Sequence, residues 1–197
     1  MRLKPYRDTD GSVILDVQQL IPLPEAAEYQ TQIKAKERAG RTERAQRYDL
    51  RYQFWSKLLA YACTQTDLHA GRSPGIYDWI GGGIGRAGFH LNYVVRETDS
   101  QVELFIDEGP DSDELNSKLF NALLQNRKQI ESVFGHELEW QDLPESRSCR
   151  IRYVIPGGYR SPETDWPEIQ QKLVASMIAL DKAFRPFVHN LPTDSMS

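Results

Sequence analysis

Four residues are of types that could form a small catalytic or binding face: Arg86, His90, Asp107 and Arg150. His90 and Asp107 fall in successive segments of alternating apolar and polar residues, so we expect them to face each other across a hairpin. A carboxylate beside an imidazole raises its basicity, which suits a small enzyme acting on an anionic substrate held by the arginines. No nucleophile motif accompanies the pair. We therefore favour a structural pair in a protein without catalytic residues, with the enzyme as the alternative.

Arg86 lies inside a glycine-rich stretch, Gly83-Ile-Gly85-Arg86-Ala-Gly88, that matches the pattern G-x-G-x-x-G. In a dinucleotide-binding fold this loop follows a strand and opens a helix whose N-terminus meets the pyrophosphate. Here the residues after the loop have the alternation of a strand, so we predict a glycine-rich bend and no cofactor. An alternative interpretation keeps Arg86 as an anion-binding residue on the loop.

The basic residues concentrate in residues 34–51, which hold seven Lys and Arg against three Asp and Glu. Side chains three residues apart drift around a helix, so these would cover half of its surface and form no sharp ridge. A solvated helix start is the favoured interpretation, and phosphate contact is the alternative. With the arginines of the sheet, the candidate anion-binding or nucleic-acid-binding residues are Arg38, Arg41, Arg44, Arg47, Arg86, Arg150 and Arg152.

The overall composition narrows the classes of partner. The 197 residues include 24 Lys and Arg against 28 Asp and Glu, a formal net charge of −4. This balance excludes a generally basic nucleic-acid coat, so any nucleic-acid contact has to be local. No apolar run reaches the roughly 18 residues of a membrane span, and the N-terminus lacks the apolar segment of a signal peptide. We expect a cytoplasmic protein that does not bind membranes.

Metal-dependent chemistry has no support in the residues. Cys63 and Cys149 are too few for a disulfide framework, and neither a Cys-x-x-Cys motif nor a cluster of histidines provides zinc ligands. Val102–Glu108 contains acids but lacks the lysine of a PD-(D/E)XK nuclease centre. We predict no metal site and no nuclease centre.

The N-terminal residues differ in pattern from the rest. Ser12–Val17 is compatible with a short strand, whereas Glu25–Arg38 lacks the apolar stripe of a packed helix. We interpret residues 1–40 as an arm, residues 41–191 as a single domain and residues 192–197 as a tail.

The predicted domain alternates helices with pairs of strands. An apolar stripe predicts a helix over Thr42–Thr64, and the Gly-rich and Pro-rich segment Asp67–Gly88 is expected to be a loop with Tyr77, Trp79 and Ile80 inserted into the core. The remaining pattern predicts strands over 89–96, 101–107, 138–141 and 148–155, and helices over 111–134 and 165–186. This order, α-β-β-α-β-β-α, predicts an α+β fold: an antiparallel sheet of two hairpins with helices packed on one face.

The register of the first hairpin follows from its apolar residues. A four-residue turn over Glu97–Ser100 would pair Val95 with Val102, and it would place His90 opposite Asp107. Arg150 and Arg152 are expected on the same face of the sheet as this pair.

Six motifs together carry a family resemblance: Arg51-Tyr-Gln-Phe54-Trp55, Ile84–Leu91, Val102–Leu104, Gln129–Gly135 with Leu138–Trp140, Cys149–Ile151, and Asp165–Pro167 with Phe184–Pro186. In this order they resemble the prokaryotic family known as domain of unknown function 4268, over the region Arg41 to Leu191. The family often lies C-terminal to a domain like the PD-(D/E)XK nucleases and has no assigned catalytic residues.

The resemblance implies a non-catalytic recognition or assembly module of a nucleic-acid-processing or defence-related system. Its partners would be nucleic acid or a nuclease-type protein. A structural homodimer that pairs through apolar helix surfaces or a sheet face is a further alternative.

Overall fold

The structure is a computed structural model that describes residues 2–7, 9–18, 24–142 and 146–192. The chain divides into two compact units, Met1–Gln46 and Arg47–Ser197. The long helix α1 (Pro24–Ala62) contributes residues to both units.

The first unit contains a hairpin and the beginning of α1. Strands β1 (Arg2–Arg7) and β2 (Val13–Gln18) pair in antiparallel fashion. The predicted strand over Ser12–Val17 is confirmed as β2 to within one residue at each end, whereas β1 was not predicted. Helix α1 begins at Pro24, well before the predicted start at Thr42, although Glu25–Arg38 lacks an apolar stripe. Pro24 suits the first turn of α1, and residues 29–46 are exposed, so helix-favouring Ala, Glu, Lys, Arg and Gln residues take the place of an apolar stripe.

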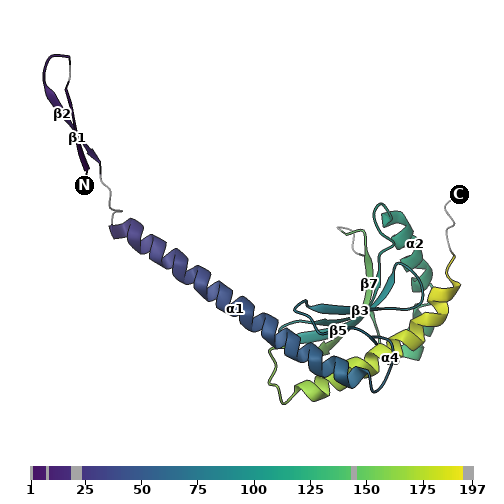
Figure 1. The fold of residues 1–197 in the computed structure, drawn as a ribbon. Coiled ribbons are helices and arrows are strands. Elements are labelled where there is room, and N and C mark those ends of the chain that lie inside the picture. The colour runs from purple at the N-terminus through teal and green to yellow at the C-terminus, as the bar shows by residue number, and fades with distance from the viewer. Residues whose placement is uncertain (1, 8, 19–23, 143–145, 193–197) are drawn as a thin grey trace. The chain divides into compact units, whose positions relative to one another are not determined.

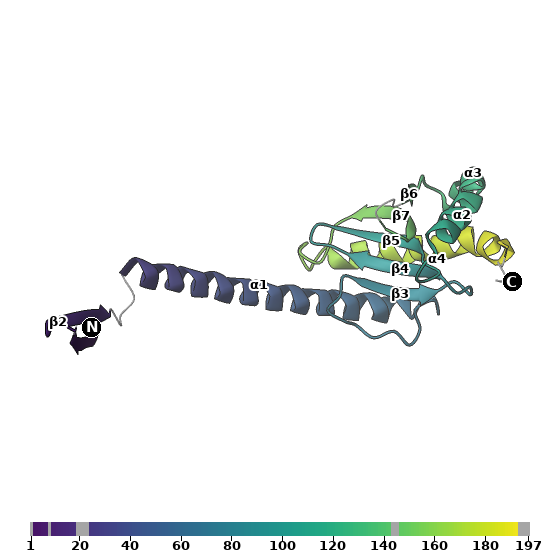
Figure 2. The same ribbon diagram turned by 90° about the horizontal axis from the view of Figure 1, so that it is seen from above.

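The second unit is built on a five-stranded antiparallel sheet. Its strands lie side by side in the order β3-β4-β5-β7-β6 (Figure 2). Their bounds are β3 (Trp79–Gly83), β4 (Phe89–Val95), β5 (Asp99–Ile106), β6 (Glu139–Asp142) and β7 (Cys149–Pro156).

Three further helices complete the unit: α2 (Asp113–Leu124), α3 (Arg127–Phe134) and α4 (Trp166–Asn190). Helix α4 runs along one face of the sheet and contacts β4, β5 and β7 (Figures 1 and 2). The α+β class with an antiparallel sheet is confirmed, and the predicted order is wrong in two places. β3 is an additional strand, and the helix predicted over 111–134 is two helices that meet at Gln125 and Asn126.

Strand β3 occupies part of the segment predicted to be a loop. Glycine is rare in strands, which is why the pattern did not predict one there. The structure shows why glycine is needed: a Cβ on Gly81 would lie 2.6 Å from Asn92 Oδ1, and one on Gly82 would lie 2.6 Å from the Leu68 carbonyl oxygen. The strand therefore tolerates close neighbours that a side chain would exclude.

The first hairpin of the predicted sheet has a tighter turn than expected. Asp99 accepts a backbone hydrogen bond from Arg96, which leaves a two-residue loop. The predicted register is therefore wrong by two residues: Val95 pairs with Ser100, and His90 lies opposite Phe105 instead of Asp107. A shift of two residues keeps every side chain on its predicted face.

The core lies between the sheet and the helices. Leu91, Leu104 and Ile151 are neighbours across three strands, and they are fully buried together with Leu173 and Met177 of α4.

The large aromatic residues divide between core and surface. Trp55, Phe134 and Ile80 are buried in the core, as predicted. Tyr77 and Trp79 are 70% and 55% exposed, so their predicted insertion into the core is wrong. In the part of the chain that the structure describes, no helix is long and apolar enough to span a membrane.

Candidate functional site

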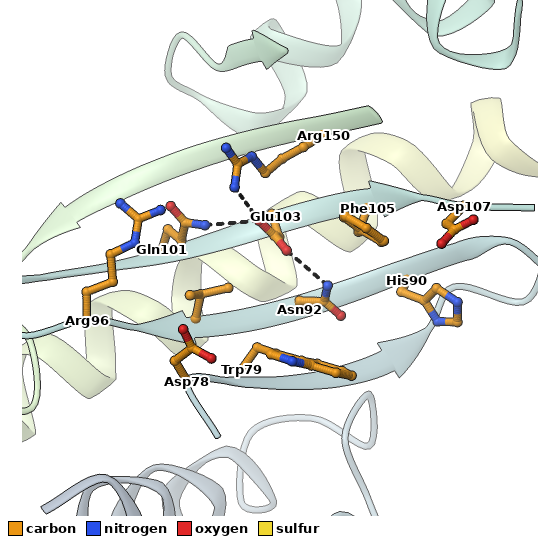
Figure 3. A pocket seen from close by; sticks show the side chains of 11 residues that line it. Asp78, Trp79, His90, Asn92, Arg96, Gln101, Glu103, Phe105, Asp107 and Arg150 are labelled. Atoms are coloured by element: carbon orange, nitrogen blue, oxygen red, sulfur yellow. Dashed lines mark hydrogen bonds and ion pairs between the residues drawn. The ribbon is translucent and has the colours of Figure 1, made fainter. Parts of the chain in front are cut away.

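The face of the sheet opposite α4, called the open face below, carries a hollow of about 500 Å³ (Figure 3). All residues that line it belong to strands or directly adjoin one. They are Asp78, Trp79, His90, Asn92, Val94, Arg96, Gln101, Glu103, Phe105, Asp107 and Arg150.

Glu103 is the central acid of the hollow and is only 5% exposed. Its Oε1 accepts a hydrogen bond from Asn92 Nδ2 at 3.0 Å, and its Oε2 accepts one from Gln101 Nε2 at 3.0 Å. The nearest guanidinium nitrogen of Arg150 lies 4.0 Å from Oε2 (Figure 3). A buried carboxylate needs such donors, so this network holds Glu103 in one orientation.

The two arginines predicted on β7 are held by neighbouring side chains. Arg150 donates two hydrogen bonds to Gln141 Oε1, at 2.9 and 2.6 Å. Arg152 binds Glu139 and donates to Gln101 Oε1 at 3.0 Å. Burial lowers the pKa of Arg150, and the Glu103 carboxylate opposes this effect. Arg150 therefore lines the hollow. Arg152 is not a lining residue, but it holds the side chain of Gln101, which is one.

Asp107 and His90 both line the hollow but do not form the predicted pair. Arg147 binds both oxygens of Asp107 and is the main reason that the pKa of this carboxyl is lowered. Among the described residues, His90 makes no hydrogen bond to that carboxylate. His90 makes a smaller, electrostatic contribution to the lowered pKa of Asp107.

Trp79 lies over the strand backbone at the edge of the hollow. A Cβ on Gly81 would lie 3.2 Å from Cζ3 of this indole and 2.6 Å from Asn92 Oδ1, so the indole and the Asn92 side chain both pack against the glycine. Asn92 is 5% exposed, and its Oδ1 has no hydrogen-bond donor among the residues that the structure describes. The indole and this acceptor form one wall of the hollow (Figure 3).

Arg86 lies apart from the hollow, which corrects the predicted face of Arg86, His90, Asp107 and Arg150. Its guanidinium donates to the carbonyl oxygens of Val188, Leu191 and Pro192 at 3.3, 2.7 and 2.7 Å. These are carbonyls at and beyond the end of α4, where a cation is favoured. The glycine-rich loop around Arg86 joins two strands, so the predicted bend is confirmed by the secondary structure.

The basic tract lies on α1. Arg38, Arg41 and Arg44 are exposed in the first unit. In the second unit, Arg47 is half-buried with its guanidinium over the Tyr48 ring, and Arg51 packs on the Tyr159 ring.

The described residues contain no cluster of three or more His, Cys, Asp or Glu side chains that could hold a metal ion. Cys63 is exposed and Cys149 is buried, both as free thiols. Burial raises the pKa of Cys149 to about 12, which leaves it protonated and unreactive at neutral pH.

Several residues of the hollow were missed by sequence reasoning. Asn92 and Gln101 occupy polar positions of strands, which usually face solvent, and only the tertiary structure shows that they are buried around Glu103. Arg147 is separated from its partner Asp107 by 40 residues and has no motif around it. The sequence did offer one signal for Asn92 and Glu103: each is a polar residue at the centre of a predicted strand, and the two strands are adjacent.

The fold and the hollow define the class: an α+β protein whose antiparallel sheet packs against helices on one face and is hollowed on the other. The chain belongs to the family described as Domain of unknown function (DUF4268), because the family model matches residues 50–188. The match covers all five strands of the sheet. No curated protein and no solved structure matches the chain.

Proposed function

We propose that this chain is a non-catalytic recognition module and that the open face of its sheet binds the partner. The observation that supports this proposal is the pairing of the charged groups of the hollow. Glu103, Asp107 and Arg150 each contact another side chain of the protein. A general acid, base or nucleophile has to reach the substrate, whereas an exposed aromatic beside a hollow of a few hundred Å³ is typical of binding sites.

The test is an NMR titration of the nitrogen-15-labelled chain with small probes of different chemistry. We would use N-acetyl-arginine amide, N-acetyl-glutamate amide, N-acetyl-tryptophan amide and adenosine monophosphate. At least one probe should shift the amide signals of β3, β4 and β5, and the Trp79→Ala variant should weaken that response. Tyr77→Ala is the matched control, because Tyr77 is exposed nearby and does not line the hollow. If no probe shifts these signals, the proposal is wrong.

The partner system is a proposal that rests on the family resemblance. We infer a cytoplasmic nucleic-acid-processing or defence-related assembly, in which nucleic acid or a nuclease-type protein is the partner. Nucleic-acid contact is the second candidate function, favoured by the exposed Arg38, Arg41 and Arg44 of α1.

A salt titration of duplex and single-stranded DNA tests this second candidate. Each neutralised phosphate contributes about 0.9 to the slope of log affinity against log salt on duplex DNA. Replacing Arg38, Arg41, Arg44 and Arg47 by Ser should reduce both affinity and slope. The control changes four exposed lysines outside the tract to Ser: Lys118, Lys128, Lys172 and Lys182. Equal binding by the two variants, or no binding by the wild type at low salt, would remove the nucleic-acid proposal.

A further inference from the structure

The floor of the hollow has acceptors that the protein does not use. Each oxygen of the Glu103 carboxylate accepts one hydrogen bond, at 3.0 Å in both cases, whereas a carboxylate has about four acceptor sites. Asn92 Oδ1 accepts no hydrogen bond from the described residues although Asn92 is almost fully buried. Since a buried acceptor without a donor is unfavourable, the group that completes this floor is a hydrogen-bond donor.

The charge and the aromatic surface of the hollow favour a cationic donor. Of the lining acids, Asp107 is already bound by Arg147, whereas Glu103 has its nearest guanidinium nitrogen, on Arg150, 4.0 Å away. An anionic ligand on the floor would meet the Glu103 carboxylate, whereas a cation would be attracted to it. The exposed indole of Trp79 adds a surface on which a cation can lie.

A guanidinium group satisfies these requirements together. It is permanently charged, it carries five N–H donors in one plane, and it stacks on aromatic rings. A lysine ammonium is also a cation, but it is compact and cannot stack in this way.

A second hollow of about 410 Å³ shares Trp79 and His90 with the first. A polypeptide that placed one side chain in the main hollow would therefore have room to continue past the indole. This adjacency favours a side chain of a polypeptide over a free small molecule.

We propose that the open face binds an arginine side chain of a partner polypeptide, with its guanidinium on the Trp79 indole and donating to Glu103. This proposal rests on the proposed function and specifies the chemistry of the partner.

The experiment compares four probes on the full labelled chain by NMR, following the Trp79 indole N–H and the amides of β3, β4 and β5. The probes are N-acetyl-arginine amide, its uncharged isostere N-acetyl-citrulline amide, N-acetyl-glutamate amide and the peptide acetyl-Gly-Arg-Gly-amide. The arginine probe should bind about tenfold or more tightly than the citrulline probe, since a hydrogen bond to a charged group is strong. The peptide should bind more tightly than the single residue because it extends into the second hollow.

Two variants test the named contacts. Glu103→Gln keeps the shape of the side chain and should weaken arginine binding by about tenfold. Trp79→Ala should weaken it by about threefold, since Trp79 is exposed and its loss leaves the core intact. The controls are Glu139→Gln, an acid of the neighbouring strand outside the hollow, and Tyr77→Ala. Native amide spectra establish that each variant is folded. If Glu103→Gln does not fold, Trp79→Ala still tests the inference.

Four results would overturn the inference: equal binding of arginine and citrulline probes, equal binding of the peptide and the single residue, a preference for the glutamate probe, or an unchanged arginine affinity in both variants. Binding of the glutamate probe alone would leave the proposed function standing. The absence of any response at the open face to these probes and to those of the broader titration would remove both.

Discussion

Arg147 binds the Asp107 carboxylate with both prongs of its guanidinium: Nε lies 2.9 Å from Oδ1 and Nη2 lies 3.0 Å from Oδ2. Asp107 follows the last residue of β5, and Arg147 lies just before β7, so the pair joins the ends of two adjacent strands. The same contact engages the carboxylate that sequence analysis assigned to His90. This ion pair thus links the end of β5 to the start of β7.

We expect this pair to make stability depend on acid pH. Arg147 lowers the pKa of Asp107 in the folded state, whereas in the unfolded chain the pKa is about 3.9. The contribution is therefore fully present above the unfolded pKa and is lost as the pH falls through the folded pKa. Urea unfolding at pH 7 should show Asp107→Asn to be less stable than the wild type, and the difference should shrink by pH 3. A difference that is constant between these pH values would contradict the assignment.

Trp55 should be essential for the core of the second unit. It is fully buried, and its Nε1 donates to the Tyr77 carbonyl oxygen at 2.8 Å. Trp55→Ala should lower the free energy of unfolding by about 3 to 5 kcal/mol, because it leaves a large cavity and an unpaired carbonyl. Chemical denaturation measures the loss. Tyr77→Ala, which keeps the same carbonyl, should stay within about 0.5 kcal/mol of the wild type.

Arg86 should stabilise the end of α4. Arg86→Ala removes three hydrogen bonds to carbonyl oxygens and should increase amide hydrogen exchange over the last turn of α4. Arg86→Lys should restore protection only in part, because an ammonium does not reproduce the planar fork. Arg38→Ala is the control, and exchange at the end of α4 should not respond to it. Unchanged exchange in Arg86→Ala would mean that the contact does not hold the helix end.

The two thiols should differ in reactivity. Cys63 is exposed, whereas Cys149 is buried with its pKa raised. A thiol reagent such as dithiobis-nitrobenzoate should modify Cys63 rapidly in the native protein and both cysteines in denaturant. Cys63→Ser should abolish the rapid native phase. Rapid modification of Cys149 in that variant would show that the strand around it opens readily.

The second unit should fold without residues 1–40. In the part of the chain that the structure describes, the core cluster runs from Phe54 to Val188. A chain that begins at Arg41 should therefore unfold at the same temperature as the full chain within a few degrees, and its Trp signals should remain native. Thermal unfolding followed by circular dichroism gives the comparison. A large drop in the midpoint would mean that the first unit contributes to the fold of the second.

The parts of the fold that follow local rules were predictable. The alternation of Phe89–Val95 gave the strand, and Gly135 ends α3 with φ of 94°, the left-handed conformation that stops a helix. The break at Asn126 was not predictable, because the apolar stripe continues from Leu123 to Ile130 on both sides of it. Strand β3 was hidden because its glycines serve close backbone approach, which leaves no periodic pattern.

The candidate site was only partly predictable, for a geometric reason. The face on which His90, Asp107 and Arg150 lie follows from alternation and survives an error of two residues in the register. Which of them touch depends on the exact register and on residues such as Arg147 that come from distant segments. The two-residue turn at Glu97 and Thr98 was the decisive feature, and the apolar residues alone are compatible with either turn length.

Helix α4 meets parts of the second unit that lie far before it in the chain. Gln170 donates to the Phe54 carbonyl oxygen, 116 positions earlier, and Arg86 reaches forward 105 positions to Leu191. During synthesis the strands of the sheet leave the ribosome before the helix that covers their apolar face. Contacts so distant in sequence also slow folding, since long loops must close before the contacts form. Between the translation of the strands and the emergence of α4, the apolar side chains of the sheet are therefore uncovered. The second unit becomes native only once α4 has emerged.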